Sequence, residues 1–145
     1  PIEALAENRA LAARLVFEMP QADYERLDPR LLAVMDGLSR LQCRFSMDQV
    51  RTPLFDMTAL RRARVRFLKL DTLWLAREVA SQGGFGRISH LKTRMDASGI
   101  DIVLEKVENE SDLRPLLDFN FDYGQGWLFG KPDLLRARMD ARRAA

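Results

Sequence analysis

Short apolar runs alternate along the chain with stretches in which apolar residues recur at helical spacing. The runs lie at residues 15–17, 45–47, 65–68, 100–104 and 123–129, and each has the length of a buried strand. Parallel neighbours in a sheet need a long crossover connection, and a helix is the usual one. The alternation therefore predicts an α/β fold with a parallel sheet.

The clearest helix begins after Asp28. The side chain of Asp28 is of a type that caps helices, and Pro29 is preferred in the first helical turn. Leu31, Met35 and Leu38 then fall on one face. The pattern predicts a helix that starts at Pro29 and has one apolar face.

Two further helices are expected, one before the fourth apolar run and one after the fifth. The first covers about residues 87–98 and is followed by Gly99, which can take the left-handed conformation that ends a helix. The second is basic and covers residues 132–143.

One more helix is expected after Asn109. Leu113, Leu116 and Leu117 fit one apolar face of this helix. Pro115 must then lie in the first turns, where its missing amide proton matters least.

Polar side chains stand where the predicted strands end. The carboxyl ends of parallel strands open onto one face, so polar residues there converge on a common site. An isolated acid is an ordinary surface charge, but acids directly after apolar residues at strand after strand are costly unless they bind something. The pattern therefore predicts a shared pocket. Its candidate members are Glu18, Asp48, Lys69, Asp71, Glu105 and Gln125.

The composition is that of a folded domain. The chain has 145 residues, of which 47% are hydrophobic and 30% are charged, and this length favours one domain. No apolar run approaches the roughly 18–20 residues of a membrane span, and the first residues do not resemble a signal peptide, so we expect no membrane contact from this segment. The chain begins with Pro1 inside a helical pattern, and we expect it to be part of a longer polypeptide.

Charge and cysteine content narrow the function classes. The 23 Lys and Arg residues are nearly balanced by 21 Asp and Glu residues, which gives a net charge of +2 and favours no nucleic-acid partner. Cys43 is the single cysteine, so it forms no internal disulfide, and one thiol is far short of a zinc cluster. A reducing compartment, the cytoplasm, is the expected location.

Four segments resemble a known family in order and spacing. They are LVFE at 15–18, the stretch from Phe45 to Asp71 that ends in KLD, LEKVEN at 104–109 and DYGQGWLF at 122–129. From residue 15 onward the chain is similar to the second half of the EAL domain, the bacterial phosphodiesterase and receptor domain for cyclic di-GMP. The resemblance implies a (β/α)₈ barrel like a TIM barrel, of which residues 1–145 are the C-terminal portion and supply roughly the last five β/α units. Upstream chain or a partner subunit is then expected to complete the barrel.

The resemblance also implies roles for the strand-end residues. In this family divalent cations held by carboxylates activate water and neutralise phosphate charge. By the resemblance, Glu18 and Asp48 are metal ligands, Lys69 holds a phosphate oxygen or the attacking water, and Glu105 works through metal-bound water. Gln125 lines the ligand pocket.

Several positions depart from the family pattern. Gln49 stands where the family has the second of two paired aspartates, and a neutral amide is a weaker ligand for Mg²⁺ or Mn²⁺. The glycine-rich loop of the family is Val-Arg-Thr-Pro at 50–53, a glycine is replaced by Lys106, and the second acid of an earlier Glu-x-x-Glu pattern is Gln21. These changes predict a domain whose catalytic machinery has decayed.

Ligand binding can outlast that decay. We expect Lys69 and Glu105 to be vestigial as catalytic residues and to remain ligand-binding residues together with Gln125. Arg51 and Lys106 are in position to replace cation charge near a phosphate. No metal is expected to be bound, and Mg²⁺ or Mn²⁺ is expected only if activity remains.

The sequence therefore predicts a catalytically degenerate EAL-like domain that binds cyclic di-GMP as a receptor in bacterial signalling. Two alternatives stay open. The domain is a ligand-independent module that binds other protein domains or forms a homodimer, or it is a residually active, metal-dependent cyclic di-GMP phosphodiesterase.

Some polar residues have simpler structural explanations. Glu18 is equally a strand-end carboxylate that meets water, Asp71 a helix cap, and Glu108 a favourable charge at a helix N-terminus. His90 lies on a helical pattern away from every strand end, which indicates a surface position. A solvated face, rather than a phosphate patch, is expected for Arg61, Arg62, Arg64 and Arg66.

Overall fold

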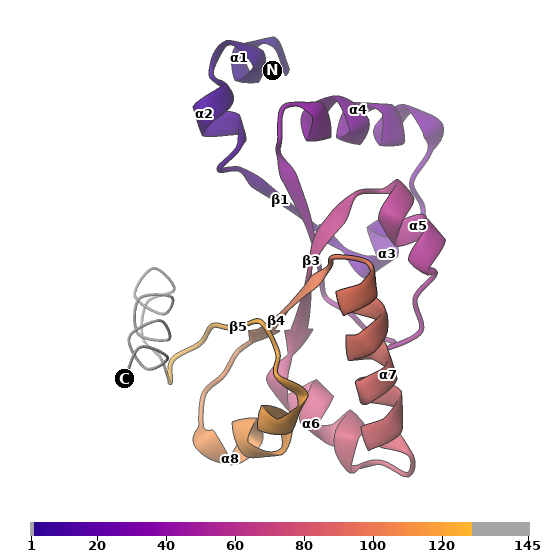
Figure 1. Ribbon diagram of the computed structural model, residues 1–145, viewed down its shortest axis with the longest axis vertical. Helices are drawn as coiled ribbons and strands as arrows, with labels where there is room; N and C mark the ends of the chain where they lie inside the picture. The colour runs from indigo at the N-terminus through magenta and orange to yellow at the C-terminus, as the bar shows by residue number, and fades with distance from the viewer. Residues whose placement is uncertain (1, 129–145) are drawn as a thin grey trace.

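The computed structural model describes residues 2–128 and contains one parallel sheet (Figure 1). Its five strands lie in chain order, and each is parallel to its neighbours, which confirms the predicted α/β class. Singly wound strands place their crossover helices on one face, because such crossovers are right-handed. The strands are β1 Val16–Pro20, β2 Arg44–Asp48, β3 Val65–Asp71, β4 Asp101–Glu105 and β5 Tyr123–Gly124.

Helices connect the strands, and Figure 1 shows α4, α5 and α7 on the same side of the sheet. Within the described residues the helices are α1 Ile2–Glu7, α2 Arg9–Ala12, α3 Gln21–Tyr24, α4 Pro29–Arg40, α5 Met57–Arg62, α6 Thr72–Ala80, α7 Gly84–Ala97 and α8 Glu110–Leu113, followed by the 3₁₀ helix η1 Arg114–Phe119. No helix among residues 2–128 combines the length and the apolar character needed to span a bilayer.

The helix predicted from Pro29 is confirmed. The carboxylate of Asp28 accepts a hydrogen bond of 2.8 Å from the Leu31 amide and so caps the first turn of α4. Met35 is buried on the face toward the sheet. The helix predicted over 87–98 is also present as α7, but it begins earlier, at Gly84, because the left-handed Gly83 turns the chain directly into it.

The single helix predicted after Asn109 was wrong. Asn109 does cap a helix, but α8 ends at Leu113, and η1 begins at Arg114 with Pro115 in its first turn. A 3₁₀ helix has three residues per turn, so apolar positions rotate away from the face that an α-helical pattern assigns. Leu117 is consequently 58% exposed rather than part of the apolar face. The basic helix predicted at 132–143 lies outside the described residues, as does the end of the run at 123–129.

The alternation within the strands separates a core face from a polar face. Met47, Leu68 and Ile102 are aligned across β2, β3 and β4, and all are at most 2% exposed. They pack against buried residues of α4 to α7 in one hydrophobic core. Side chains of a strand alternate between its two faces, so Lys69, between Leu68 and Leu70, lies on the opposite face.

Both edges of the described sheet are open. β1 pairs only with β2, and β5 pairs only with β4, within residues 2–128. At the β1 edge Val16 and Phe17 are 40% and 38% exposed, which is high for apolar strand residues. A five-stranded, singly wound parallel sheet with helices on one face has the architecture of part of a (β/α)₈ barrel.

Candidate functional site

The centre of the candidate site is the side chain of Lys69 in β3. Its Nζ lies 2.5 Å from Oε1 of Glu18 in β1 and 3.1 Å from Oε1 of Glu105 in β4. The lysine side chain is 12% exposed, so it bridges the two carboxylates in a largely desolvated position. The structure thus brings together three predicted site residues from three strands.

The environment of Lys69 favours its charged form. Burial alone acts to lower the pKa of the ammonium, but hydrogen bonds and charges from Glu18 and Glu105 outweigh it, and the net pKa is raised above the ordinary value. Lys69 therefore carries a fixed positive charge at neutral pH. Two carboxylates and one ammonium leave the triad with one excess negative charge.

Asp48 ends β2 but does not belong to this triad. Its Oδ1 is buried and has no hydrogen-bond partner among the described residues, and the same holds for the Tyr24 hydroxyl. Burial, and after it the negative charge of Asp48, raise the pKa of Tyr24. Ser46, two residues before Asp48 in β2 and on the same face, also has a buried and unpaired hydroxyl. The end of β2 therefore holds buried polar atoms that have no hydrogen-bond partner within residues 2–128.

Asp71 and Lys106 form the next layer toward the end of the sheet. Asp71 is level with Glu105 in the sheet and caps α6 through a 3.0 Å hydrogen bond from the Trp74 amide. The capping role considered for Asp71 is thus present. Its other oxygen lies 3.4 Å from Nζ of Lys106, whose side chain is 71% exposed. Thr72 fixes this corner by donating a 2.6 Å hydrogen bond to the carbonyl of Glu105.

Gln125 lies at the same edge, where backbone hydrogen bonds hold it. Its amide donates to the carbonyl of Leu104 at 2.8 Å, and its carbonyl accepts from the amide of Val107 at 3.0 Å. These bonds place Gln125 against the segment that carries Glu105. The expected pocket-lining role of its side chain stays a prediction.

Gln21 holds the loop that follows β2. The patterns of strands and helices in the sequence do not reveal this contact. The Gln21 carboxamide oxygen accepts a 2.8 Å hydrogen bond from the Arg51 amide, and its nitrogen donates to the Thr52 carbonyl at 3.4 Å. Gln21 is 5% exposed, so both bonds lie in a protected position. A carboxamide can donate and accept in this way, whereas the ionised carboxylate of a glutamate only accepts.

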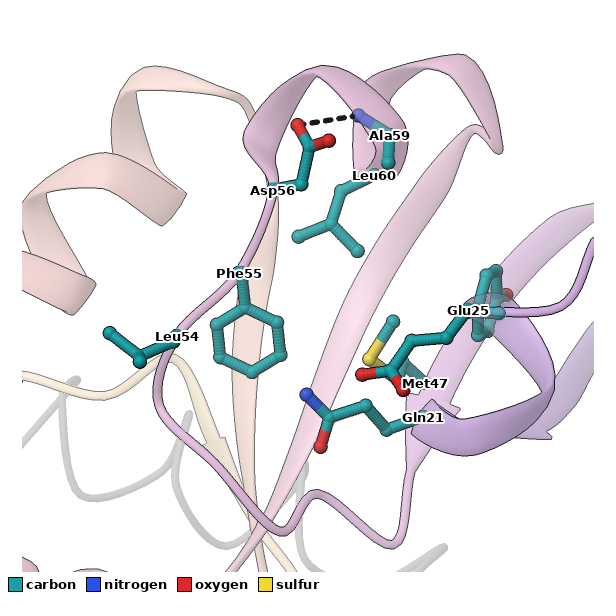
Figure 2. A pocket seen from close by; sticks show the side chains of 9 residues that line it. Gln21, Glu25, Met47, Leu54, Phe55, Asp56, Ala59 and Leu60 are labelled. Carbon is teal, nitrogen blue, oxygen red and sulfur yellow. Dashed lines mark hydrogen bonds between the residues drawn. The ribbon is translucent and has the colours of Figure 1, made fainter.

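A cavity of about 80 Å³ lies beside this loop (Figure 2). Ligand pockets for small molecules typically measure about 300–1,000 Å³, so this cavity is too small for a nucleotide. None of the predicted site residues lines it. Figure 2 shows Gln21, Glu25 and Met47 on one side and Leu54, Phe55, Asp56, Ala59 and Leu60 around the other.

The described residues do not form a metal cage by themselves. Among residues 2–128 no three His, Cys, Asp or Glu side chains are grouped closely enough to hold a metal ion. Between Glu18 and Glu105 the cationic group is the Lys69 ammonium. Asp48, with its unpaired buried oxygen, keeps one donor available for a cation. The predicted metal-ligand roles of Glu18 and Asp48 stay predictions.

Neither His90 nor any of the four arginines at 61, 62, 64 and 66 is paired with Glu18, Lys69 or Glu105. His90 is exposed on α7, and the four arginines do not form a single patch, because Arg64 pairs with Asp36 at 2.9 Å while Arg66 pairs with Asp101 at 3.9 Å. Arg61 and Arg62 are exposed at the end of α5. This arrangement agrees with a solvated face.

Comparisons with known proteins agree with this architecture. The model of the EAL domain family matches residues 2–132. The cyclic di-GMP phosphodiesterase PdeF of Escherichia coli K12 is 25% identical over 138 residues, which are 93% of this chain and 18% of PdeF. The cyclic di-GMP phosphodiesterase PdeA of Borreliella burgdorferi is 33% identical over 69 residues, which are 48% of this chain and 10% of PdeA. The chain therefore spans less than a fifth of either curated relative.

Solved structures show the same fold. Vibrio cholerae LapD, in an apo form with S helix, GGDEF and EAL parts, aligns with a TM-score of 0.74 at 16% identity over 90% of this chain and 32% of that one. The PaMucR phosphodiesterase in complex with c-di-GMP aligns with a TM-score of 0.68 at 24% identity over 83% of this chain and 49% of that one. The five-stranded sheet thus corresponds to part of an EAL barrel.

Proposed function

Because this chain belongs to the EAL domain family, we propose that it is the C-terminal portion of an EAL domain that binds cyclic di-GMP without hydrolysing it. In this proposal its five strands are the last five of the barrel. The domain acts as a receptor in bacterial signalling rather than as a working phosphodiesterase.

One observation carries the proposal. The Lys69 ammonium lies between Glu18 and Glu105 and satisfies both carboxylates directly. A phosphodiester oxygen that approaches this ammonium meets a fixed positive charge in a partly desolvated position, where charge-assisted hydrogen bonds are strong. Because two carboxylates surround this ammonium, an anion binds here only with further positive charge nearby, and in this proposal the protein rather than a divalent cation supplies that charge.

The positions around the triad support binding over catalysis. Gln49 and Gln21 are neutral where the family pattern has acids, and Gln21 is engaged by the loop at Arg51 and Thr52. Both changes remove negative charge that hard cations need. Asp48 remains as a lone carboxylate at the end of β2.

In the receptor, different residues of this chain bind the phosphodiester and the base of the ligand. Lys69 donates to a phosphodiester oxygen, and Glu105 and Glu18 keep its ammonium in place. Gln125 presents a carboxamide that can pair with the edge of a guanine base, and its backbone bonds to Leu104 and Val107 hold it against β4. The c-di-GMP complex of the PaMucR phosphodiesterase, a structural neighbour, supports this choice of ligand.

A ligand-independent interaction module is the second candidate, and exposed apolar side chains favour it. Phe85 is 57% exposed at the start of α7 and packs on Phe119 with ring centroids 4.8 Å apart. Leu117, in the same η1 helix as Phe119, is also exposed. Exposed apolar groups of this kind are typical of protein-binding surfaces.

The test uses the natural full-length protein. Calorimetric titration with cyclic di-GMP in the presence of EDTA measures binding, and chromatography after long incubation with Mg²⁺ or Mn²⁺ detects linear product. Binding at micromolar or lower Kd with no product supports the receptor. Product formation contradicts it and identifies a residual phosphodiesterase, whereas absence of binding leaves the interaction module.

A further inference from the structure

Lys106 occupies an unusual backbone position at the edge of the site. It directly follows Glu105, the last residue of β4, and its φ is +54°. Left-handed backbone strains a residue with a Cβ, and glycine avoids most of that strain. Arg64 shares this conformation outside the site, so the role of Lys106 is argued from its place beside Glu105 and not from its backbone alone.

The ammonium of Lys106 is far more accessible than that of Lys69. The side chain of Lys106 is 71% exposed, and its one charged partner among residues 2–128 is Asp71, at 3.4 Å. By contrast, Lys69 is 12% exposed and is engaged by two carboxylates. An ammonium has three donors, so Lys106 retains donors for a ligand that lies above the strand ends.

The placement of Lys106 relative to the triad follows from the sheet register. Asp71 and Glu105 are level in β3 and β4, and Thr72 links the two corners through the Glu105 carbonyl. Lys106 therefore stands next to the residue that holds Lys69. The two ammonium groups belong to one edge, with Lys69 inside and Lys106 at the rim.

We propose that Lys106 is a phosphate-binding residue that supplies the second positive charge for a phosphodiester ligand and exchanges its contact with Asp71 for the ligand. This inference rests on the proposed function and names the group that stands in for cation charge at the same site. Ligand affinity is then independent of divalent cations and depends on the charge at position 106.

Three substitutions in the full-length protein test this inference by titration with cyclic di-GMP in EDTA. Lys106→Met removes the charge and keeps the length, and Lys106→Arg keeps the charge. We expect Lys106→Met to raise Kd by about five- to tenfold, in the range of one charge-assisted hydrogen bond at an exposed site, and Lys106→Arg to stay within about twofold of wild type. Replacing EDTA by Mn²⁺ leaves the wild-type Kd unchanged.

Lys106→Gly separates binding from stability. Glycine relieves the left-handed backbone, so the melting temperature rises, while loss of the ammonium weakens binding. A purely structural role predicts that affinity is kept or improved when the strain is removed. Arg62→Met, which removes one exposed positive charge far from the site, is the matched control and leaves Kd unchanged.

The outcomes distinguish this inference from the proposed function. Wild-type binding with unchanged Kd in Lys106→Met and Lys106→Gly overturns the inference and leaves the receptor intact. A wild-type Kd that falls when Mn²⁺ replaces EDTA also overturns it. Absence of wild-type binding overturns both.

Discussion

The ammonium of Lys69 lies 2.5 Å from the carboxylate of Glu18, although β3 and β1 are separated in the sheet by β2. Ser46 of β2 stands between them, in register with Glu18, and is only 1% exposed. A small side chain there leaves room for the lysine to cross to the next strand. The register thus places a small, uncharged and buried side chain of β2 level with Glu18.

Removing Lys69 is expected to weaken cyclic di-GMP binding strongly. Lys69→Ala deletes the buried ammonium and leaves Glu18 and Glu105 as repelling, partly desolvated carboxylates. We expect Kd to rise by about 10- to 100-fold, since hydrogen bonds to charged groups are worth about 1.5–3 kcal/mol. Glu105→Ala removes one of the two groups that hold the ammonium, and a smaller increase is expected.

The control for this pair is His90→Ala. His90 is exposed on α7 and has no contact with the triad, so its replacement leaves Kd unchanged. Lys69→Met removes the charge but keeps the length of the side chain, so it is the second variant if Lys69→Ala does not fold. Thermal melting of each variant shows whether it is folded. Equal affinity in Lys69→Ala, Glu105→Ala and His90→Ala contradicts the placement of the ligand.

Restoring a single acid is not expected to restore catalysis. In Gln49→Asp the backbone stays left-handed, with φ of +46° in the present chain, and Asp accepts that conformation well. However, Lys106 and the loop at 50–53 still differ from the family pattern, and Lys69 still occupies the space between two carboxylates. Chromatography after incubation with Mn²⁺ is expected to show no linear product, and measurable hydrolysis by this variant contradicts the importance given to the loop and Lys106.

The sequence was sufficient for the fold class and for the grouping of the central residues. Glu18, Lys69 and Glu105 follow apolar residues in separate runs, and parallel strands bring such ends to one side. The alternation was also enough to place Asp28 at a helix start. The spacing of apolar residues predicts these elements because each segment shows by itself which of its faces is buried.

Other features depend on partners that periodicity does not encode. Gln21 contacts Arg51, thirty positions away, through hydrogen bonds that no local pattern reveals. Leu117 is exposed because the segment from Arg114 is a 3₁₀ helix, whose period is 3 rather than 3.6 residues per turn. The separation of Asp48 from the triad likewise depends on how the strand ends are placed in space.

Replacing Gln21 by Glu is expected to loosen the loop that it holds. In the wild type the Gln21 side-chain nitrogen lies 3.4 Å from the Thr52 carbonyl oxygen and donates to it. In Gln21→Glu this donor is lost, and a carboxylate oxygen faces the carbonyl oxygen instead. A buried acceptor without a donor costs about 1–3 kcal/mol. Hydrogen exchange of residues 50–55 is expected to become faster, with little change in β3.

Gln42→Glu is the matched control for that experiment, because Gln42 is exposed in the turn after α4 and the charge change is the same. Its exchange at 50–55 stays at the wild-type rate. Unchanged exchange in Gln21→Glu contradicts the assignment of Gln21 as the residue that holds the loop.

Gly126 is expected to be essential for the position of β5. Its φ is +152°, and a Cβ at this residue stands 2.4 Å from the backbone nitrogen and oxygen of Val107. Such a contact cannot persist, so Gly126→Ala must disturb the backbone hydrogen bond that the Val107 amide donates to the Gln125 carbonyl. We expect a loss of at least about 2 kcal/mol in the free energy of unfolding.

Gly37→Ala makes the same chemical change and is expected to shift the free energy of unfolding in the opposite direction. Gly37 lies inside α4, and a Cβ there meets no atom within 4 Å. Alanine in a helix interior is favoured over glycine by about 0.5–1 kcal/mol, so this variant is expected to be more stable than wild type. Urea unfolding of the full-length protein, followed through the transition of this domain, measures both changes. If Gly126→Ala unfolds at the wild-type urea concentration, the close approach of Gly126 to Val107 is wrong, and with it the backbone support of Gln125.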